Sequence, residues 1–269
     1  MAKVVLITGI SSGFGKAISE LLSSEGYAVY GINRSQNEDL DGKIKVLQAD
    51  VTDVISIQQA IATLLTREDR IDILINNAGM GITGSIEDSS HDDIHLQMST
   101  NFMGYVNMIQ AVLPAMRAQR GATIVNISSI GGLMGLPYQG FYAASKFAVE
   151  GLSESLRMEL LPYKIKIVVI QPGDFHTSFT ANRKPALSQN GGSVYASQFE
   201  KTLSLIEKDE KGGLKPEFLA RKLSKILKKK NPCHSYIIAT LEQKFAVVLK
   251  RILPGSMFSS ILSSHYGIK

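Results

Sequence analysis

The chain has 269 residues, of which 44% are apolar and 20% charged, and its formal net charge is +5. These proportions exclude an intrinsically disordered chain and fit one well-packed domain better than two. The basic residues are spread out except at residues 228–230, which we interpret as a solvated helix end with its cations at the negative pole of the helix dipole. We therefore expect no nucleic acid among the partners.

The number of cysteines and the length of the apolar runs indicate in which cellular compartment the protein is expected. The single cysteine, Cys233, excludes an intrachain disulfide and a zinc site of paired cysteines, and it fits a reducing compartment. The apolar run at residues 4–7 is too short for a signal peptide, and no run reaches the roughly 18 apolar residues of a membrane span. The expected location is cytoplasmic. We interpret the spaced pair His91 and His95 as solvated groups at a helix start, so no metal site is expected.

Short apolar runs alternate with segments of helical apolar spacing along most of the chain. Strands are expected at residues 4–8, 28–33, 43–48, 71–76, 122–128, 166–171 and 235–239. Helices are expected at residues 15–25, 54–66, 94–118 and 142–161. Strands that are apolar on both faces indicate a sheet covered on both sides, and regular alternation with helices indicates a parallel one. The predicted fold class is α/β: a doubly wound Rossmann-type parallel sheet of about seven strands with helices on both faces.

Two regions break this rhythm. Residues 1–239 are predicted to form one domain, but residues 178–213 contain no predicted strand and carry two glycine pairs. A connection this long after a strand is typical of a lid or binding loop, so we expect a substrate lid there. Residues 240–269 have apolar side chains at helical spacing up to Ile252, followed by the helix breaker Pro254. They are predicted to form an apolar helical extension.

A glycine-rich loop lies where the first strand should turn into the first helix. A dinucleotide pyrophosphate needs a tight turn, close approach of the backbone and the N-terminus of a helix, and glycine provides the first two. The spacing is G-x-x-x-G-x-G, which differs from the commoner G-x-G-x-x-G. The loop residues expected to bind a dinucleotide are Gly9, Ser11, Ser12, Gly13, Phe14 and Gly15.

The end of the second predicted strand favours one form of the cofactor. Asn33 and Arg34 stand where an acidic side chain would hold the ribose 2′-hydroxyl of NAD(H). A guanidinium binds a 2′-phosphate with charge-assisted hydrogen bonds, whereas a carboxylate would repel it. The sequence therefore predicts NADP(H). In the alternative interpretation Arg34 is a surface residue, and Asp39 or Asp41 reaches the ribose instead.

A tyrosine and a lysine form the candidate acid–base pair. Tyr142 and Lys146 stand four residues apart on a predicted helix, so their side chains share one face. A free phenol titrates near ~10, and a nearby ammonium lowers that pKa toward the range of efficient proton transfer. The predicted strand before them ends in the hydroxyls of Ser128 and Ser129, at the edge of the sheet where ligands bind.

Several short motifs follow one another in order. They are Thr8-Gly9-x-x-x-Gly13-x-Gly15, Asp50-Val51-Thr52-Asp53, Asn76-Asn77-Ala78-Gly79, Asn101, Ser129, Tyr142-x-x-x-Lys146 and Pro172-Gly173. In this order they resemble the short-chain dehydrogenase/reductases in their basic single-domain form, over about residues 3–239. The segment 249–255 also resembles the branch that includes 17β-hydroxysteroid and retinol dehydrogenases. The resemblance implies hydride transfer between a nicotinamide and a carbonyl or secondary alcohol.

The resemblance also implies a role for each catalytic residue. Tyr142 would protonate the carbonyl oxygen, and Lys146 would lower the tyrosine pKa and hold the nicotinamide ribose. Ser129 would hydrogen-bond the substrate oxygen; Ser128 is its nearest rival, but the 13-residue gap to the tyrosine matches Ser129. Asn101 would hold a water that links Lys146 to solvent.

The remaining cofactor contacts follow from the same resemblance. Asp50 would bind the adenine amino group and Val51 the edge of its ring. The implied contacts to ribose and carboxamide are Asn77, Ala78, Gly79, Pro172, Gly173, Phe175 and Thr177. Family members also pair through the helices predicted at residues 94–118 and 142–161, which implies a homodimer or homotetramer.

Apolar residues near the site suggest the substrate. Met134 and Tyr138 lie in the loop between serine and tyrosine, which lines the substrate pocket in this family, and His176 is a candidate substrate contact. With the apolar lid and tail, they predict a bulky hydrophobic ketone or alcohol, either steroid-like or a long-chain keto-lipid such as a 3-keto sphingoid base. Two alternatives stay open: an NADP(H)-sensing regulator without catalysis, and a lipid-handling protein whose tail, through residues 245–252, rests on a membrane surface.

Overall fold

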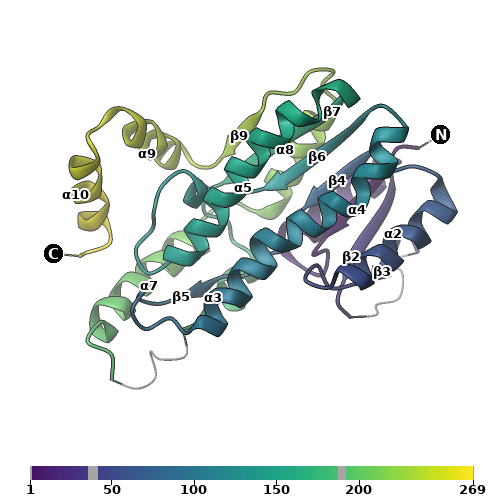
Figure 1. Cartoon of the computed structure of the whole chain (residues 1–269). Helices are drawn as coiled ribbons and strands as arrows, with labels where there is room; N and C mark the ends of the chain where they lie inside the picture. Colours follow the sequence, from purple (N-terminus) through teal and green to yellow (C-terminus); the bar gives the residue numbers. More distant parts are fainter. Residues whose placement is uncertain (1, 36–41, 187–191, 269) are drawn as a thin grey trace.

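Seven parallel strands form the central sheet of the computed structural model, which describes residues 2–35, 42–186 and 192–268 (Figure 1). The strands are β1 (Val4–Thr8), β2 (Ala28–Asn33), β3 (Ile44–Gln48), β4 (Ile73–Asn76), β6 (Ala122–Ile127), β7 (Ile165–Pro172) and β9 (Ser235–Ile238). Their spatial order is β3-β2-β1-β4-β6-β7-β9, so the winding direction reverses between β1 and β4. This confirms the predicted Rossmann-type sheet, in which ligands bind at the point of reversal.

Helices cover both faces of the sheet. They are α1 (Gly13–Ser24), α2 (Val54–Glu68), α3 (His91–Met98), α4 (Gly104–Ala118), α5 (Gly140–Glu159), α6 (Ser178–Ala181), α7 (Ala196–Lys211), α8 (Pro216–Leu227), α9 (Leu241–Ile252) and α10 (Gly255–His265). Side chains of α2, α4 and α5 form one buried cluster with the sheet, and those of α1 and α8 form a second. The helices of the two clusters lie on opposite faces, as expected for a doubly wound sheet.

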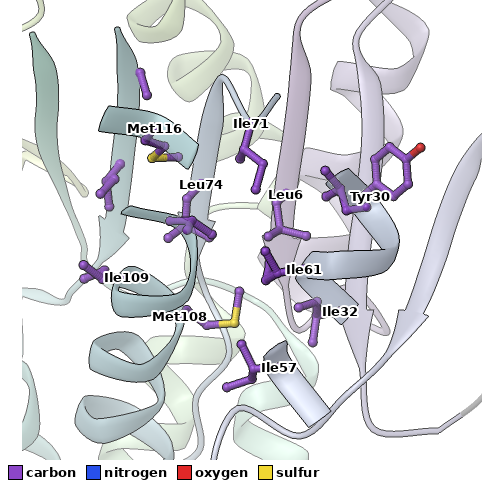
Figure 2. Packing of buried hydrophobic residues seen from close by; sticks show 14 of the residues in the cluster. Leu6, Tyr30, Ile32, Ile57, Ile61, Ile71, Leu74, Met108, Ile109 and Met116 are labelled. Carbon is purple, nitrogen blue, oxygen red and sulfur yellow. The ribbon is translucent and has the colours of Figure 1, made fainter. Parts of the chain in front are cut away.

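Strand β1 contributes to both clusters because successive side chains of a strand point to opposite faces. Leu6 lies among Ile61 of α2, Leu74 of β4 and Met108 of α4 (Figure 2). Its neighbour Ile7 belongs to the cluster with α1 and α8. Each such fully buried side chain stabilises the fold by about 1.5–3 kcal/mol. This packing anchors β1 in the middle of the sheet and fixes the point where the glycine-rich loop begins.

The helix predicted over residues 94–118 is interrupted. A π-helical segment, Ser99–Met103, separates α3 from α4. At its centre, Asn101 accepts a hydrogen bond from the Met80 amide (2.8 Å) and donates one to the Met80 oxygen (2.9 Å). The extra residue in a π turn lets Asn101 make these bonds without ending the helix. Apolar periodicity does not register such a local change of pitch, so the prediction of one unbroken helix was wrong.

The expected strand-free segment 178–213 also differs from the prediction in one place. The short strand β8 (Lys184–Pro185) pairs with β5 (Ile82–Thr83), which follows β4. The backbone amide of Lys184 donates a 3.0 Å bond to the oxygen of Gly81, and that of Ala186 donates a 2.9 Å bond to the oxygen of Thr83 in β5. Pro185 lies between these donors, where its missing N–H costs no ladder bond. The segment is thereby attached to the body of the domain. Asn190 and Gly191, part of its predicted turn signal, lie outside the described residues.

The tail forms α9 and α10 (Figure 1). Helix α9 begins with a capping box, in which the Thr240 and Gln243 side chains bind each other's backbone amides. Val247 of α9 and Phe258 of α10 are buried against Met134, in the loop that follows β6. Among the helices that the structure describes, none is long and apolar enough to span a bilayer.

Candidate active site

A cleft of about 1200 Å³ lies at the carboxyl ends of the strands, where open parallel sheets bind their ligands. The predicted site residues that line it are Gly9, Ser11, Ser12, Gly13, Phe14, Asn33, Arg34, Asp50, Val51, Asn77, Ala78, Gly79, Ser129, Tyr142, Lys146, Pro172, Gly173, Phe175 and Thr177. Gly15 and Asn101 lie behind this lining. The fold thus brings together residues from the whole length of the predicted domain.

The glycine-rich loop depends on missing side chains. Gly9 and Gly13 have φ values of +73° and +55°, which favour glycine. A Cβ on Gly15 would lie only 2.0 Å from the oxygen of Gly9, so this helix packs directly on the loop. No described side chain caps the start of α1, and its first turn carries no acidic residue. The free N–H groups and the positive end of the helix dipole therefore fit a pyrophosphate.

Thr8 fixes the loop to the neighbouring strand. Its hydroxyl oxygen accepts hydrogen bonds from the backbone amides of Asn77 and Ala78, both at 2.9 Å. The Asn77 side-chain amide donates in return to the oxygens of Thr8 (2.9 Å) and Gly9 (3.0 Å). Asn77, predicted only as a ribose contact, thus also holds the phosphate loop. Sequence reasoning did not assign Thr8 a role, although its place directly before Gly9 at a strand end was the available signal.

The adenine side of the cleft carries the predicted cation and carboxylate. Arg34 is exposed beside the cleft, and no described carboxylate forms an ion pair with it. Asp39 and Asp41, the alternative ribose ligands, lie outside the described residues. One Asp50 oxygen accepts bonds of 2.8 Å from both the amide and the hydroxyl of Thr52, which fixes the carboxylate in the cleft wall. On this side of the cleft, a guanidinium that has no ion-pair partner among the described residues is available to an anion.

Tyr142 and Ser129 meet at the end of β6. Their side chains are hydrogen-bonded, and this bond acts to lower the pKa of Tyr142. Burial has the larger effect and raises the pKa of Tyr142 to about 12. Ser128 also lines the cleft, but its hydroxyl lies beside Gly132, 2.6 Å from where a Cβ on that glycine would stand. By contrast, Ser129 and Tyr142 both lie within 3.5 Å of where a Cβ on Gly131 would stand. Of the two serines, the geometry therefore places Ser129 beside the tyrosine.

Lys146 is buried behind Tyr142. Its ammonium donates a 2.9 Å hydrogen bond to the oxygen of Ile127 and lies 5.3 and 5.8 Å from the ring centres of Tyr105 and Tyr142. Burial lowers the pKa of Lys146 to about 8, because desolvation disfavours the cation. The pKa of Tyr142 thus lies above its ordinary value, opposite to the direction expected from Lys146, because desolvation of the phenol outweighs its favourable contacts.

Asn101 is fully buried behind the cleft wall. Besides its two bonds to Met80, it donates a 3.3 Å hydrogen bond to the hydroxyl of Ser145 on α5. Its side chain therefore connects the π segment, the loop after β4 and the helix that carries Tyr142. The water-holding role implied for Asn101 stays a prediction.

The carboxylates of the lid and the loop after β7 were missed by the sequence reasoning. The guanidinium of Arg183 pairs with Glu210, which also accepts a 2.5 Å bond from the hydroxyl of Thr180. Asp174 accepts a bond from the Gln243 side chain of α9. Burial raises the pKa of Asp174 to about 6, and the charge of nearby Glu210 adds to this rise. These contacts join segments too distant in sequence for a local motif to reveal.

The same loop depends on a glycine. A Cβ on Gly173 would lie 2.1 Å from the Gln243 side-chain oxygen, so the α9 side chain occupies the space that a larger residue would need. His176 in this loop, predicted as a candidate substrate contact, is exposed and is not among the residues that line the cleft. Tyr138 likewise packs away from the cleft, against the Phe199 ring of α7.

The tail supplies an apolar wall to the cleft. Its lining residues there are Ala246, Leu249, Phe258, Ile261 and Leu262. Met134 and Leu136 extend the wall from the loop after Ser129, and Phe179 of the lid packs on the ring of Tyr142 at 5.7 Å. The candidate pair Tyr142 and Lys146 thus stands between a polar edge formed by the glycine-rich loop and a wall suited to hydrocarbon.

Comparison with known proteins identifies the fold's relatives. Residues 3–188 match the family model described as short chain dehydrogenase. The chain belongs to the short-chain dehydrogenase family. Among solved members of this fold, a short-chain dehydrogenase from Streptomyces avermitilis has a TM-score of 0.83 and 28% identity, covering 98% of this chain and 94% of that one.

Two curated relatives differ in how much of this chain their similarity covers. The 3-ketodihydrosphingosine reductase of Bacteroides thetaiotaomicron is 46% identical over 267 residues, which make up 99% of each chain. Human 17-beta-hydroxysteroid dehydrogenase type 1 is 38% identical over 191 residues, 65% of this chain and 58% of the human one. Similarity to the bacterial enzyme therefore extends through lid and tail, whereas similarity to the human enzyme spans about two thirds of this chain.

Proposed function

We propose that this short-chain dehydrogenase is an NADPH-dependent reductase of a long-chain keto-lipid such as a 3-keto sphingoid base. The observation that carries the proposal is the apolar wall of the cleft, which the tail supplies through Leu249, Phe258 and Leu262. An alkyl chain packs on such a wall while its carbonyl lies at Tyr142. Similarity to the 3-ketodihydrosphingosine reductase over 99% of the chain, tail included, supports this substrate class over a steroid.

The residues of the cleft fit NADPH. The uncapped start of α1 suits the pyrophosphate, and Arg34 suits the 2′-phosphate that distinguishes NADPH from NADH. Asp50 and Asn77 would hold the adenine and a ribose. When bound, NADPH supplies the hydride that forms the new C–H bond and becomes NADP⁺.

The chain's own residues handle the proton and the carbonyl oxygen. Tyr142 donates its hydroxyl proton to that oxygen, so the ketone becomes a secondary alcohol and the tyrosine a phenolate. The Ser129 hydroxyl holds the oxygen in place and stabilises the negative charge that develops on it. Lys146 lies close enough to Tyr142 to stabilise the phenolate, and its pKa of about 8 lets it pass on a proton near neutral pH.

The test is NADPH oxidation against a panel of carbonyl substrates, with NADH in parallel. The panel contains a 3-keto sphingoid base, a steroid ketone, a retinal and a small aromatic ketone. We expect turnover of the keto-lipid with NADPH and little turnover of the others. A preference for the steroid would show that the substrate is a steroid ketone and not a keto-lipid. Tight NADPH binding without turnover of any carbonyl would favour a regulator that senses NADP(H) without catalysis.

We also propose that two or four copies associate through α4 and α5. Phe147 and Met158 on the outside of α5 and Leu161 beyond its end are large apolar side chains that are 46%, 72% and 74% exposed. Such a group on one surface favours burial against another copy. Light scattering of Met158→Glu tests this, since a glutamate there would reduce the assembled mass.

A further inference from the structure

The tail carries a second group of apolar side chains, exposed to solvent and continuous with the cleft wall at Ile261. We call it the tail face, and its residues are Leu241, Phe245, Val248, Ile252, Met257 and Ile261. Leu241, Phe245 and Ile252 are 83%, 62% and 68% exposed, although each is large and apolar. A monomeric soluble protein rarely leaves so many neighbouring apolar side chains in water.

The α9 part of this face is continuous. Leu241, Phe245, Val248 and Ile252 fall within about 60° of one another around a helix of 3.6 residues per turn. The other side of α9 is already occupied, because Val247 is buried against Met134 and Phe258. Packing within the described chain therefore does not account for the tail face.

The charges beside this face point to its partner. Residues 241–268 contain three basic residues, Lys244, Lys250 and Arg251, and one carboxylate, Glu242. Lys244 and Arg251 are exposed, have no ion-pair partner among the described residues, and lie along one edge of the α9 stripe. Long basic side chains beside an apolar stripe suit anionic lipid headgroups, with the apolar residues inserted below them. A second copy that docked through the same face would bring three cations and only one carboxylate, Glu242.

The tail face also meets the cleft. Ile261 is 49% exposed on the tail face and lines the cleft as well. Ala246 and Leu249 of α9 continue the apolar lining inward from the same helix pair. A lipid that leaves a bilayer under this face would therefore pass along apolar side chains toward Tyr142.

We propose that the tail face docks on an anionic bilayer surface and holds the mouth of the cleft against it. The helices lie on the membrane and do not cross it. This docking is independent of the proposed reaction, because neither Phe245 nor Ile252 lines the cleft. It would explain how a water-insoluble substrate enters without passing through bulk solvent.

The test is co-sedimentation of the full chain with vesicles of phosphatidylcholine, with and without phosphatidylglycerol. We expect binding that requires phosphatidylglycerol and weakens with salt. Phe245→Glu/Ile252→Glu should lower the partition coefficient at least about tenfold. The matched control is Val54→Glu/Ile55→Glu at the start of α2, which changes equally many exposed apolar residues and the same charge. It should bind like the unaltered chain. Lys244→Gln/Arg251→Gln should remove the dependence on phosphatidylglycerol.

Three results would overturn the proposal. The unaltered chain could fail to sediment with either vesicle, or both glutamate pairs could lower binding equally. Finally, the unaltered chain could fail to bind vesicles while the Phe245→Glu/Ile252→Glu variant has a lower assembled mass in light scattering. This result would assign the tail face to contact with a second copy. Turnover of a short, water-soluble ketone by the same variants separates these outcomes from failure of the proposed reaction, since the docking variants leave the cleft lining unchanged.

Discussion

The two sides of the cleft are built by different means. The cofactor side is built largely from backbone and glycines, with a few polar side chains such as Arg34 and Asp50, and it is held by contacts such as those between Thr8 and Asn77. The substrate side consists of side chains from the lid and tail, such as Phe179, Gln243 and Phe258. The family match covers residues 3–188 and omits the tail. The cofactor side thus lies within the matched residues, whereas the apolar wall supplied by the tail lies beyond them.

The largest effect is expected from a change at Tyr142, which lies where the cofactor side and the substrate side meet and is the proposed proton donor. Tyr142→Phe removes the hydroxyl that we propose protonates the carbonyl oxygen, and kcat should fall by about 10²–10⁴-fold. The Kd for NADPH should change less than about twofold, because the ring remains in place. Stopped-flow turnover and fluorescence titration measure the two quantities. Turnover close to that of the unaltered enzyme would show that another group donates the proton.

The cofactor side is tested by removing its cation. Arg34→Ala should weaken NADPH binding by roughly 10–100-fold, the effect of losing a charge-assisted hydrogen bond of about 1.5–3 kcal/mol. NADH lacks the 2′-phosphate, and its affinity should hardly change. Titration of both cofactors against the variant measures the difference. Equal losses for the two would mean that Arg34 does not contact the 2′-phosphate.

A smaller effect, on stability, is expected at Gly15, because the glycine-rich loop leaves no space for a side chain there. Gly15→Ala places a Cβ against the Gly9 oxygen, so the loop must shift, and unfolding free energy should drop by about 1–3 kcal/mol. Gly151→Ala on α5 is the control, because its Cβ would have open space and alanine favours a helix. Urea unfolding compares the two variants. A stable Gly15→Ala protein that still binds NADPH would show that the loop has more room than the structure provides.

The substrate side should respond to pH through Asp174. Burial raises the folded-state pKa of Asp174 to about 6 from an ordinary value of 3.8, so the folded chain binds this proton more tightly than the unfolded chain. Asp174 therefore costs stability as pH rises from 3.8 to 6, and the cost is complete above pH 6. Asp174→Asn keeps an acceptor for Gln243 and should stabilise the chain by about 1–2 kcal/mol at pH 7.5, with little difference at pH 4. Urea unfolding at both values tests this, and a gain that is the same at both would exclude titration as its cause.

The difference between the two sides also explains what the sequence could predict. Glycine spacing, strand ends and the Tyr142–Lys146 pair are local patterns, and the structure brings them to one cleft. The π turn around Asn101 depends on Met80, and the carboxylate of Asp174 depends on Gln243, 69 residues away. Such pairs leave no periodic signal, because each joins residues that are far apart in the sequence: Asn101 with the loop after β4, and Asp174 with the tail. The pKa of Tyr142 was misjudged for the same reason, since its burial depends on the lid and tail.

The close approach of Gln243 to Gly173 has a consequence for how the tail is attached. The space that the glycine leaves is taken by the Gln243 side chain, which also caps the start of α9. A larger residue at position 173 would displace this side chain, and with it the first turn of the helix that supplies part of the cleft wall. One missing methyl group in the loop after β7 thus acts as a socket for the C-terminal helices.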